Sequence, residues 1–540
     1  MSVFRSKIVT GSETFAENRA AMLTLVDQLR SYEARAEQLS EKRRPRFEER
    51  GQLTPRERLA RLLDPGMPFL ALHTMANFLA EDPDIETSVP GASLITGIGF
   101  VGGVRSLVWV DDSGIRAGAM TDMGMPAVLS IQNIAKRQRL PLIHCVESAG
   151  ANLVAYKVQL WSEAGAVFRN LAQLSAMGIP TLAVLHGPST AGGAYMPGLS
   201  DYVVGIKKNG MAALAGAALT QAATGETSTD AELGGAEMHA TTSGVVEYLA
   251  EDDAEGLATA RRVFAGLNWN DGLPALPQRS FAEPIYDPDE IAGVVPADNT
   301  IPYDVREVVA RLVDGSDFED FKSRYGVSTV CIQASVYGQA VGILGNNGPI
   351  DIAGATKAAQ FLQLCDQAGK PVIFLHNTTG YMVGKETEQA GMIKHGSKMI
   401  QAVSNLRVPK LAFHIGNSYG AGNYGMCGWA YEPDFLFSWP NSTTGVMGGA
   451  QAAKTMSQVA IAGAKRKGVD PDMATIAKQE ATIRDIFDRQ ASAWYTSGQV
   501  LDHGIIDPRD TRRVIGFVLE TILEARNRTL RPNAFGVARM

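Results

Sequence analysis

The chain lacks the sequence signs of several large protein classes. It has no run of about 18 apolar residues, so we expect no membrane span. Its four cysteines form no CxxC pair, which argues against zinc and dithiol redox motifs and favours buried free thiols. The net charge of −7 argues against a nucleic-acid partner. The first residues show no secretory signal, so we expect a cytoplasmic location, or the mitochondrial matrix in a eukaryote although no clear transit peptide is present.

Common catalytic motifs are also missing. There is no HExxH and no cluster that predicts a metal site. The segment 380–386 is similar to a phosphate loop, but its spacing is one residue short and Glu386 replaces the required Ser or Thr. We therefore expect no ATP site. His144, His186 and His376 lie in apolar runs, where a hydrogen-bonded core histidine is the favoured interpretation over a catalytic one.

Glycine is abundant, with 55 residues, and one glycine-rich stretch follows a predicted strand. The apolar run 180–186 leads into 187–195, which contains the adjacent pair Gly192 and Gly193. Glycine permits a positive φ, and two adjacent N–H groups can bind one anionic oxygen, as in an oxyanion hole. A purely structural turn is the alternative interpretation.

This stretch occurs twice. The segment 409–424 repeats 180–195 about 230 residues later, and 371–380 repeats 141–150 at nearly the same spacing. In each half, an apolar strand therefore ends twice in a loop of small residues. The repetition predicts two copies of one fold, each with backbone donors at a strand end.

The order of the predicted elements indicates an α/β protein. The length of 540 residues predicts two to four domains, and strands alternate with helices from about residue 94 as repeated ββα units. We expect helices over 12–40, 123–138, 160–176, 250–268, 304–313 and 511–527, and a capping box at 54–57 that opens another. Six prolines in 274–302 predict a linker, and the chain after residue 530 is expected to be a loose tail.

Several long strings make the chain resemble the β (carboxyltransferase) subunits of biotin-dependent acyl-CoA carboxylases, over about residues 20–527. The similarity is greatest to the branch of 3-methylcrotonyl-CoA and geranyl-CoA carboxylases. The matching strings are 53–59, 189–195, 222–226, 233–236, 345–348, 378–384, 418–426 and 446–449. The resemblance implies two tandem crotonase-like domains (ββα superhelices): residues 1–276 on the acyl-CoA side and 277–540 on the biotin side.

The resemblance also assigns site residues. By their place in the family motifs, Gly192 and Gly193 match the thioester oxyanion hole, and Ala421 and Gly422 match the hole on the biotin side. The expected substrate-binding residues are Ser148, Ala149, Gly150, Ala151, Ala191, Tyr195, Gly380 and Tyr424. These roles use backbone N–H groups, so the side chains need only be small. The family site forms between the N-terminal domain of one subunit and the C-terminal domain of another.

The implied reaction is transfer of a carboxyl group from N-carboxybiotin to an acyl-CoA through an enolate, with a branched enoyl-CoA as substrate. The alternatives are α-carboxylation of a saturated acyl-CoA of the propionyl-CoA type, a biotin-dependent acyl-CoA decarboxylase subunit, and an inactive structural subunit. No Met-Lys-Met stretch occurs, so the resemblance implies biotin on a partner α subunit that has biotin carboxylase and biotinyl domains. Coenzyme A enters as part of the substrate, and the expected assembly is a homo-oligomer, a hexamer, with no membrane partner.

Some positions depart from the family. The first loop reads Glu147-Ser-Ala-Gly-Ala where Asp-Ser-Gly-Gly-Ala is expected, and 215–218 and 448–451 also differ. The oxyanion glycines are unaffected, so these changes bear on the acyl group alone. The basic segment 41–46 is interpreted as a solvated surface, with a contact to CoA phosphates or a partner subunit as the alternative.

Overall fold

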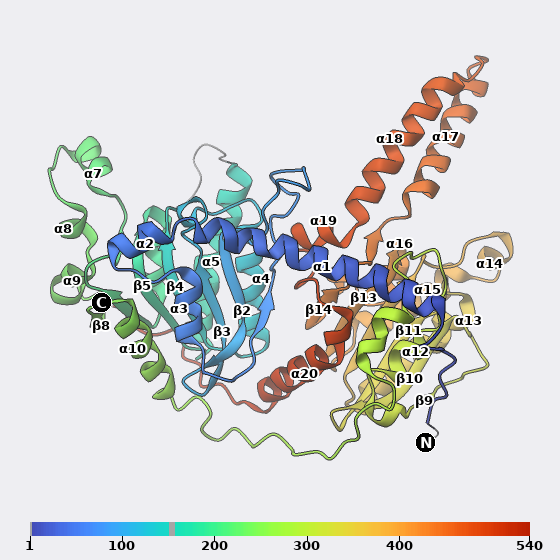
Figure 1. Ribbon diagram of the computed structural model, residues 1–540, viewed down its shortest axis with the longest axis horizontal. Coiled ribbons are helices and arrows are strands. Elements are labelled where there is room, and N and C mark those ends of the chain that lie inside the picture. The colour runs from blue at the N-terminus through green and yellow to red at the C-terminus, as the bar shows by residue number, and fades with distance from the viewer. Residues whose placement is uncertain (1–2, 151–156, 540) are drawn as a thin grey trace. The chain divides into compact units, whose positions relative to one another are not determined.

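The computed structural model describes residues 3–150 and 157–539, and they form two compact units (Figure 1). The N-unit comprises residues 31–276, 498–500 and those from 519 onward. The C-unit comprises residues up to 30, 277–497 and 501–518. Along the chain, the main change from the N-unit to the C-unit falls between residues 276 and 277. The units differ from that division at the two ends of the chain, because each terminal segment packs with the other half.

The N-unit contains a sheet of eight strands among the described residues, in the order β1-β2-β3-β4-β5-β6-β8, with β7 paired to β5. The strands are β1 (Leu70–Leu72), β2 (Leu94–Val101), β3 (Val104–Asp111), β4 (Leu142–Ser148), β5 (Thr181–Thr190), β6 (Tyr202–Ile206), β7 (Met211–Ala213) and β8 (Tyr248–Ala250). The strands from β3 to β8 run parallel, whereas β1 to β3 pair antiparallel.

The C-unit repeats this plan. Its sheet has the order β14-β13-β12-β11-β10-β9, with β15 paired to β13. The strands are β9 (Glu319–Asp320), β10 (Thr329–Val336), β11 (Gln339–Asn346), β12 (Val372–Thr378), β13 (Lys410–Tyr419), β14 (Phe435–Ser438) and β15 (Thr443–Gly445). The duplication predicted from the sequence is therefore present in the strand order, pairing and direction.

Helices connect and cover the strands. Those that begin before residue 277 are α1 (Glu13–Glu41), α2 (Arg44–Arg50), α3 (Pro55–Leu62), α4 (Gly124–Arg137), α5 (Val158–Ala176), α6 (Tyr195–Leu199), α7 (Ala217–Thr224), α8 (Asp230–Gly234), α9 (Ala236–Met238) and α10 (Asp253–Ala265). The later ones are α11 (Ile291–Val294), α12 (Val305–Ala310), α13 (Ile352–Gln367), α14 (Lys385–Gln389), α15 (Met392–Ser404), α16 (Gly420–Gly425), α17 (Gly449–Arg466), α18 (Met473–Ala491), α19 (Ala493–Gly498) and α20 (Thr511–Asn527). Within the described residues, none of these helices has the length and apolar character needed to cross a membrane.

The antiparallel hairpin of each unit is closed by the same device. The two-residue turns between β2 and β3 and between β10 and β11 have positive φ at both positions, as type I′ hairpins require. Asp64 accepts from the N–H groups of both turn residues in the N-unit, at 2.9 and 2.7 Å. Asp314 does the same in the C-unit, again at 2.9 and 2.7 Å. An arginine pairs with each carboxylate, Arg261 and Arg512 respectively, both at 2.9 Å.

Most predicted elements are present. The helices and the capping box of Thr54 with Glu57 are confirmed, and all four cysteines are buried and free. Two expectations are wrong. The proline-rich segment is only partly a linker, because 291–296 is buried and contains α11. The tail after residue 530 is largely exposed but is attached to the N-unit, since Arg539 donates to the carbonyls of Leu199 and Ser200 and pairs with Asp201.

The long pair α17 and α18 has only the short α7 and α8 as its counterpart in the N-unit, and the sequence analysis missed it. The two helices run antiparallel and extend away from their own sheet (Figure 1). Ser457 donates to Glu480 at 3.0 Å, and the N–H of Gly449 donates to Asp488 at 3.2 Å. Apolar side chains such as Met456, Val459 and Ile486 remain exposed on it.

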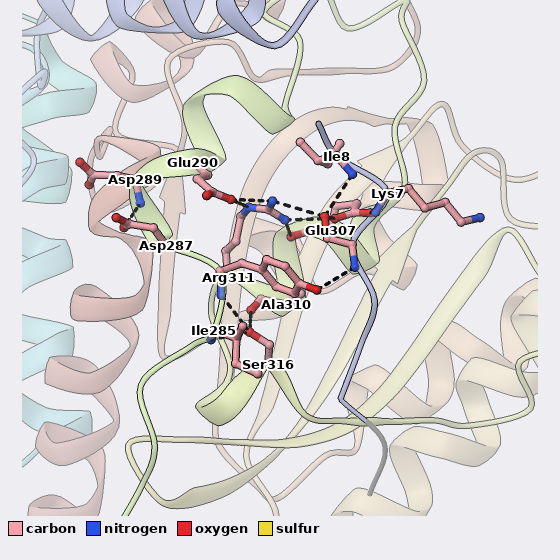
Figure 2. Close-up of polar contacts among 12 residues, drawn as sticks. Lys7, Ile8, Ile285, Asp287, Asp289, Glu290, Glu307, Ala310, Arg311 and Ser316 are labelled. Atoms are coloured by element: carbon pink, nitrogen blue, oxygen red, sulfur yellow. Dashed lines mark hydrogen bonds and ion pairs between the residues drawn. The ribbon is translucent and has the colours of Figure 1, made fainter. Parts of the chain in front are cut away.

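A buried arginine attaches the N-terminal segment to the C-unit. Figure 2 shows the guanidinium of Arg311 between Glu290, at 2.7 Å, and Glu307, at 3.0 Å. Glu307 also accepts from the Ser6 hydroxyl at 2.6 Å and from the N–H of Lys7 at 2.7 Å. Arg311 is 1 % exposed, so this charge is compensated only by its protein partners. The first residues of the chain belong to the C-unit for this reason.

We predict that Arg311→Met destabilises the C-unit by about 3–5 kcal/mol, because Glu307 would stay buried without a cation. The measurement is the unfolding midpoint, together with proteolysis of the first twelve residues, which should be released. Arg407→Ala is the matched control, since that arginine pairs with Asp366 while 81 % exposed, and should leave the unfolding midpoint nearly unchanged. Equal losses in the two variants would contradict the prediction.

Candidate active site

In each unit, two loops meet where neighbouring parallel strands end. Ser148 at the end of β4 pairs with Ser189 of β5, and Thr378 at the end of β12 pairs with Ser418 of β13. Both pairings contain a register shift just before this point, at 146/148 and at 376/378. The carboxyl ends of parallel strands are a usual place for ligand sites in α/β folds. The sequence-predicted loops are therefore brought together within each unit.

A short helix begins directly after each central strand. The 3₁₀ turn Ala191–Ala194 follows β5, and α16 follows β13. The first N–H groups of a helix have no acceptor within it, so those of Gly192, Gly193, Ala421 and Gly422 point out of the first turn. These four candidate residues thus occupy equivalent places in the two units.

The conformational reason expected for the glycines is wrong. Gly192, Gly193 and Gly422 do not have the positive φ that glycine permits. The left-handed residues are the preceding ones, Ala191 with φ of 55° and Gly420 with φ of 57°. Close packing instead explains the glycine at Gly422, where an added Cβ would lie 2.7 Å from the Cα of Gly380, whereas one at Gly192 would meet its nearest atom only at 3.7 Å.

The small loop of the N-unit has fewer free donors than expected. The N–H of Ala149 donates to the carbonyl of Ala117 at 3.0 Å, and that of Gly150 donates to the Ser148 hydroxyl at 3.1 Å. The Ser148 hydroxyl in turn donates to the carbonyl of Gly118 at 2.7 Å. This loop therefore contributes a fixed shape rather than unpaired N–H groups. Ala151 lies outside the described residues.

The remaining candidates lie beside the two short helices. Gly380 has φ of 120° and its carbonyl accepts from Ile350 at 2.9 Å, which holds it against α16. Tyr195 and Tyr424 are both about half exposed at the equivalent ends of these turns. Their rings contact Phe168 at 5.9 Å and Tyr431 at 5.6 Å between centroids.

The buried histidines serve structure. Burial lowers the pKa of His186, of His376 and of His414, the last to about 4, so they are neutral near pH 7. His376 shares a hydrogen bond of 2.8 Å with the Ser418 hydroxyl, which also accepts from Asn423 of α16 at 2.8 Å. The interpretation of these histidines as core residues is consistent with this geometry.

Behind His414 lies a buried acid. The Asp502 carboxyl accepts from the hydroxyls of Ser438 and Ser497 at 2.6 and 2.8 Å, and Ser438 lies 3.3 Å from Nδ1 of His414. Burial raises the pKa of Asp502 to about 6, although these hydrogen bonds and one from Gly504 lower it. The sequence showed no sign of this group, because nothing local distinguishes Asp502 from a surface aspartate.

A cavity of about 170 Å³ lies beside the small loop of the N-unit. It is lined by Arg43, Arg46, Phe47, Arg50, Gln52, Ser113, Ala117, Glu147, Ser148, Ala149 and Pro188. Two arginines of the basic segment therefore face the same space as the predicted acyl-CoA loop. Phe47 and Arg50, which α2 also contributes, were not predicted.

The duplicated sheets and their paired loops define a two-domain protein of the crotonase-like carboxyltransferase class. The family model of the carboxyl transferase domain matches residues 46–537, and the chain belongs to this family. The enzyme class and fold class expected from the sequence are confirmed.

Relatives of known name agree with the expected branch. The chain is 47 % identical over 496 residues to the probable biotin-dependent acyl-coenzyme A carboxylase beta2 subunit of Mycobacterium tuberculosis, covering 92 % of both. It is 41 % identical over 540 residues to the mitochondrial methylcrotonoyl-CoA carboxylase beta chain of Arabidopsis thaliana, covering 98 % of this chain and 90 % of that one. The crystal structure of the geranyl-CoA carboxylase beta subunit of P. aeruginosa has a TM-score of 0.93 at 48 % identity, with 100 % of both chains covered.

We predict that Asp502→Asn changes the pH dependence of stability. The folded-state pKa of about 6 exceeds the ordinary value of 3.8, so the folded state binds the proton more tightly and wild-type stability falls as pH rises from about 4 to above 6. The variant lacks this loss, which is on the order of 3 kcal/mol. Unfolding midpoints of both proteins at pH 4.5 and 7.5 test this. Parallel curves of stability against pH for the two proteins would show that folding does not raise the pKa of Asp502.

Proposed function

We propose that this chain is the carboxyltransferase subunit of a biotin-dependent acyl-CoA carboxylase and that backbone N–H groups stabilise the negative charge of the reaction. The observation that supports this is the duplicated first turn, with Gly192 and Gly193 in one unit and Ala421 and Gly422 in the other. An acyl-CoA that loses its proton forms a thioester enolate, whose oxygen needs donors. Biotin, when carried in by a partner, supplies the carboxyl group, and its ureido oxygen needs a second pair.

The acyl-CoA is assigned to the N-unit. Arg43, Arg46 and Arg50 line the cavity beside Ser148 and Ala149, and guanidinium groups suit the phosphates of coenzyme A. The thioester would lie over the turn at Gly192 and Gly193, next to the ordered loop 148–150. The C-unit, with Gly380, Ala421, Gly422 and Tyr424 at the equivalent place, takes the biotin side.

The proposed acyl group is a branched enoyl chain, as in 3-methylcrotonyl-CoA or geranyl-CoA. The similarity at 48 % identity to a geranyl-CoA carboxylase beta subunit supports this choice over a saturated acyl-CoA. The proposed partner is an α subunit with biotin carboxylase and biotinyl domains. The proposed assembly is a hexamer, in which the N-unit of one subunit and the C-unit of another share a site.

The isolated chain should fix no bicarbonate, because it has neither an ATP site nor a biotinyl lysine in its sequence. Incorporation of labelled bicarbonate into 3-methylcrotonyl-CoA and geranyl-CoA is measured with and without the α subunit and ATP. We expect label only in the complete mixture. ATP-dependent carboxylation by the pure chain would contradict the proposal that the α subunit supplies the ATP site and the biotin.

Substitution of Gly193 and of Gly422 should affect the binding of acyl-CoA differently. Gly193→Val places a branched side chain against Ser189, whose Oγ would lie 3.0 Å from the new Cβ, and should weaken acyl-CoA binding. Gly422→Val meets the backbone of Gly380 at 2.7 Å and should leave acyl-CoA affinity largely intact. Both should lower transfer by a hundredfold or more, since one lost oxyanion donor costs about 3 kcal/mol.

Acyl-CoA affinity by titration, and the transfer rate, are measured on variants whose oligomeric state matches the wild type by light scattering. Gly198→Ala is a matched control, because an added Cβ there meets nothing within 4 Å. The opposite pattern, with acyl-CoA binding lost in Gly422→Val and kept in Gly193→Val, would mean that the units have been assigned the wrong way round.

A further inference from the structure

The duplication provides an internal comparison at the site. Glu147 of the N-unit and Asn377 of the C-unit lie at the same register shift of β4 and β12. Each lies against a glycine of the next strand: a Cβ on Gly187 would be 2.5 Å from Glu147, and one on Gly416 would be 2.4 Å from Asn377. The geometry is shared, but one side chain is an acid and the other an amide.

The residues that face Glu147 and Asn377 from the neighbouring strands differ in the same way, as an acid in the N-unit and an amide in the C-unit. The N–H of Glu147 donates to the carboxylate of Asp111 at 3.1 Å, whereas the N–H of Asn377 lies 3.5 Å from the amide oxygen of Asn346. The C-unit therefore builds this strand end from neutral amides. The N-unit builds it from carboxylates, of which Glu147 is only 5 % exposed and requires a cation.

Arg58 of α3 supplies that cation. It is 0 % exposed, and its Nη1 lies 2.6 Å from Oε2 of Glu147 while its Nε lies 3.1 Å from Oδ2 of Asp253. Asp253 in turn bonds His186 at 2.8 Å and accepts from the N–H of Leu53 at 2.8 Å. Both carboxylates that bind the guanidinium thus have a further polar contact.

This network ends at the acyl-CoA loop. Glu147 directly precedes Ser148, and its carbonyl would lie 2.4 Å from a Cβ on Gly118, to whose carbonyl the Ser148 hydroxyl donates. Gln52 bonds the carbonyl of His186 at 2.8 Å and reaches Glu147 at 3.4 Å. Glu147 and Gln52 line the cavity, whereas Arg58 does not.

We propose that Arg58 is a positioning residue for acyl-CoA, which acts through Glu147 to hold the loop 148–150 and has no contact with the substrate. This rests on the proposed function for the identity of the ligand. A buried carboxylate that loses its cation must move toward water or take up a proton, and either change displaces the residue that begins the loop. The neutral strand end of the C-unit has no such dependence.

The test compares Arg58→Lys with Arg311→Lys. Both arginines are buried and bridge two carboxylates, and Arg311 lies in the C-unit among Glu290 and Glu307. Lysine keeps the charge but cannot bond both acids in the fork geometry of arginine. We expect Arg58→Lys to raise the dissociation constant for acyl-CoA and its KM at least tenfold, with a smaller change in kcat and none in the KM for the biotinylated α subunit. Arg311→Lys should leave both KM values unchanged.

Deuterium exchange of the backbone at 147–150 is measured on the same proteins without substrate, and we expect faster exchange in Arg58→Lys alone. If Arg58→Lys fails to fold, Glu147→Gln replaces it, with the same expectations. Unchanged exchange in a folded variant, or an equal rise in KM in Arg311→Lys, would overturn the proposal. A wild-type protein that binds no acyl-CoA would refute the proposed function, while the exchange data would still decide the role of Arg58.

Discussion

The site depends on how closely two parallel strands approach each other at their carboxyl ends. In both units a side chain at the register shift, Glu147 or Asn377, occupies the space where the next strand has a glycine instead of a larger residue. Without that space the strands would separate, and the loop and the short helix that follow them would move apart. Gly187 and Gly416 thus matter for the site although neither contacts a substrate in the proposed arrangement.

The two units use one backbone with different electrostatics. The N-unit places ionised groups beneath its loop, Arg58 with Glu147 and Asp253, and presents further arginines to the cavity above it. The C-unit uses amides and neutral histidines at the equivalent positions, with His376 and Ser418 behind α16. A highly anionic coenzyme and an uncharged ureido ring would make such different demands, so this asymmetry agrees with acyl-CoA on one side and biotin on the other.

The backbone angles in the two units also show that the glycine-rich turns differ from the conformation expected from the sequence. A sequence with adjacent glycines suggests left-handed backbone, yet the left-handed residues are Ala191 and Gly420, one position earlier. The candidate donors are ordinary first-turn N–H groups of short helices, which lack acceptors whatever the side chain is. This explains why alanine occupies position 421 in the C-unit, where position 192 of the N-unit is glycine.

The sequence by itself determined the duplication, the α/β class and the helices with strong periodicity, because these follow from local spacing and from repeated strings. The role of the four residues at the two turns came from the family resemblance and stays a prediction. The division into acyl-CoA and biotin sides stays a prediction. Only the tertiary structure decided that Arg58 reaches Glu147, that Asp502 is buried beside Ser438, and that Arg43, Arg46 and Arg50 share a cavity with Ser148. These pairs are far apart in the chain, and whether a charged side chain is solvated or buried depends on which distant elements pack around it.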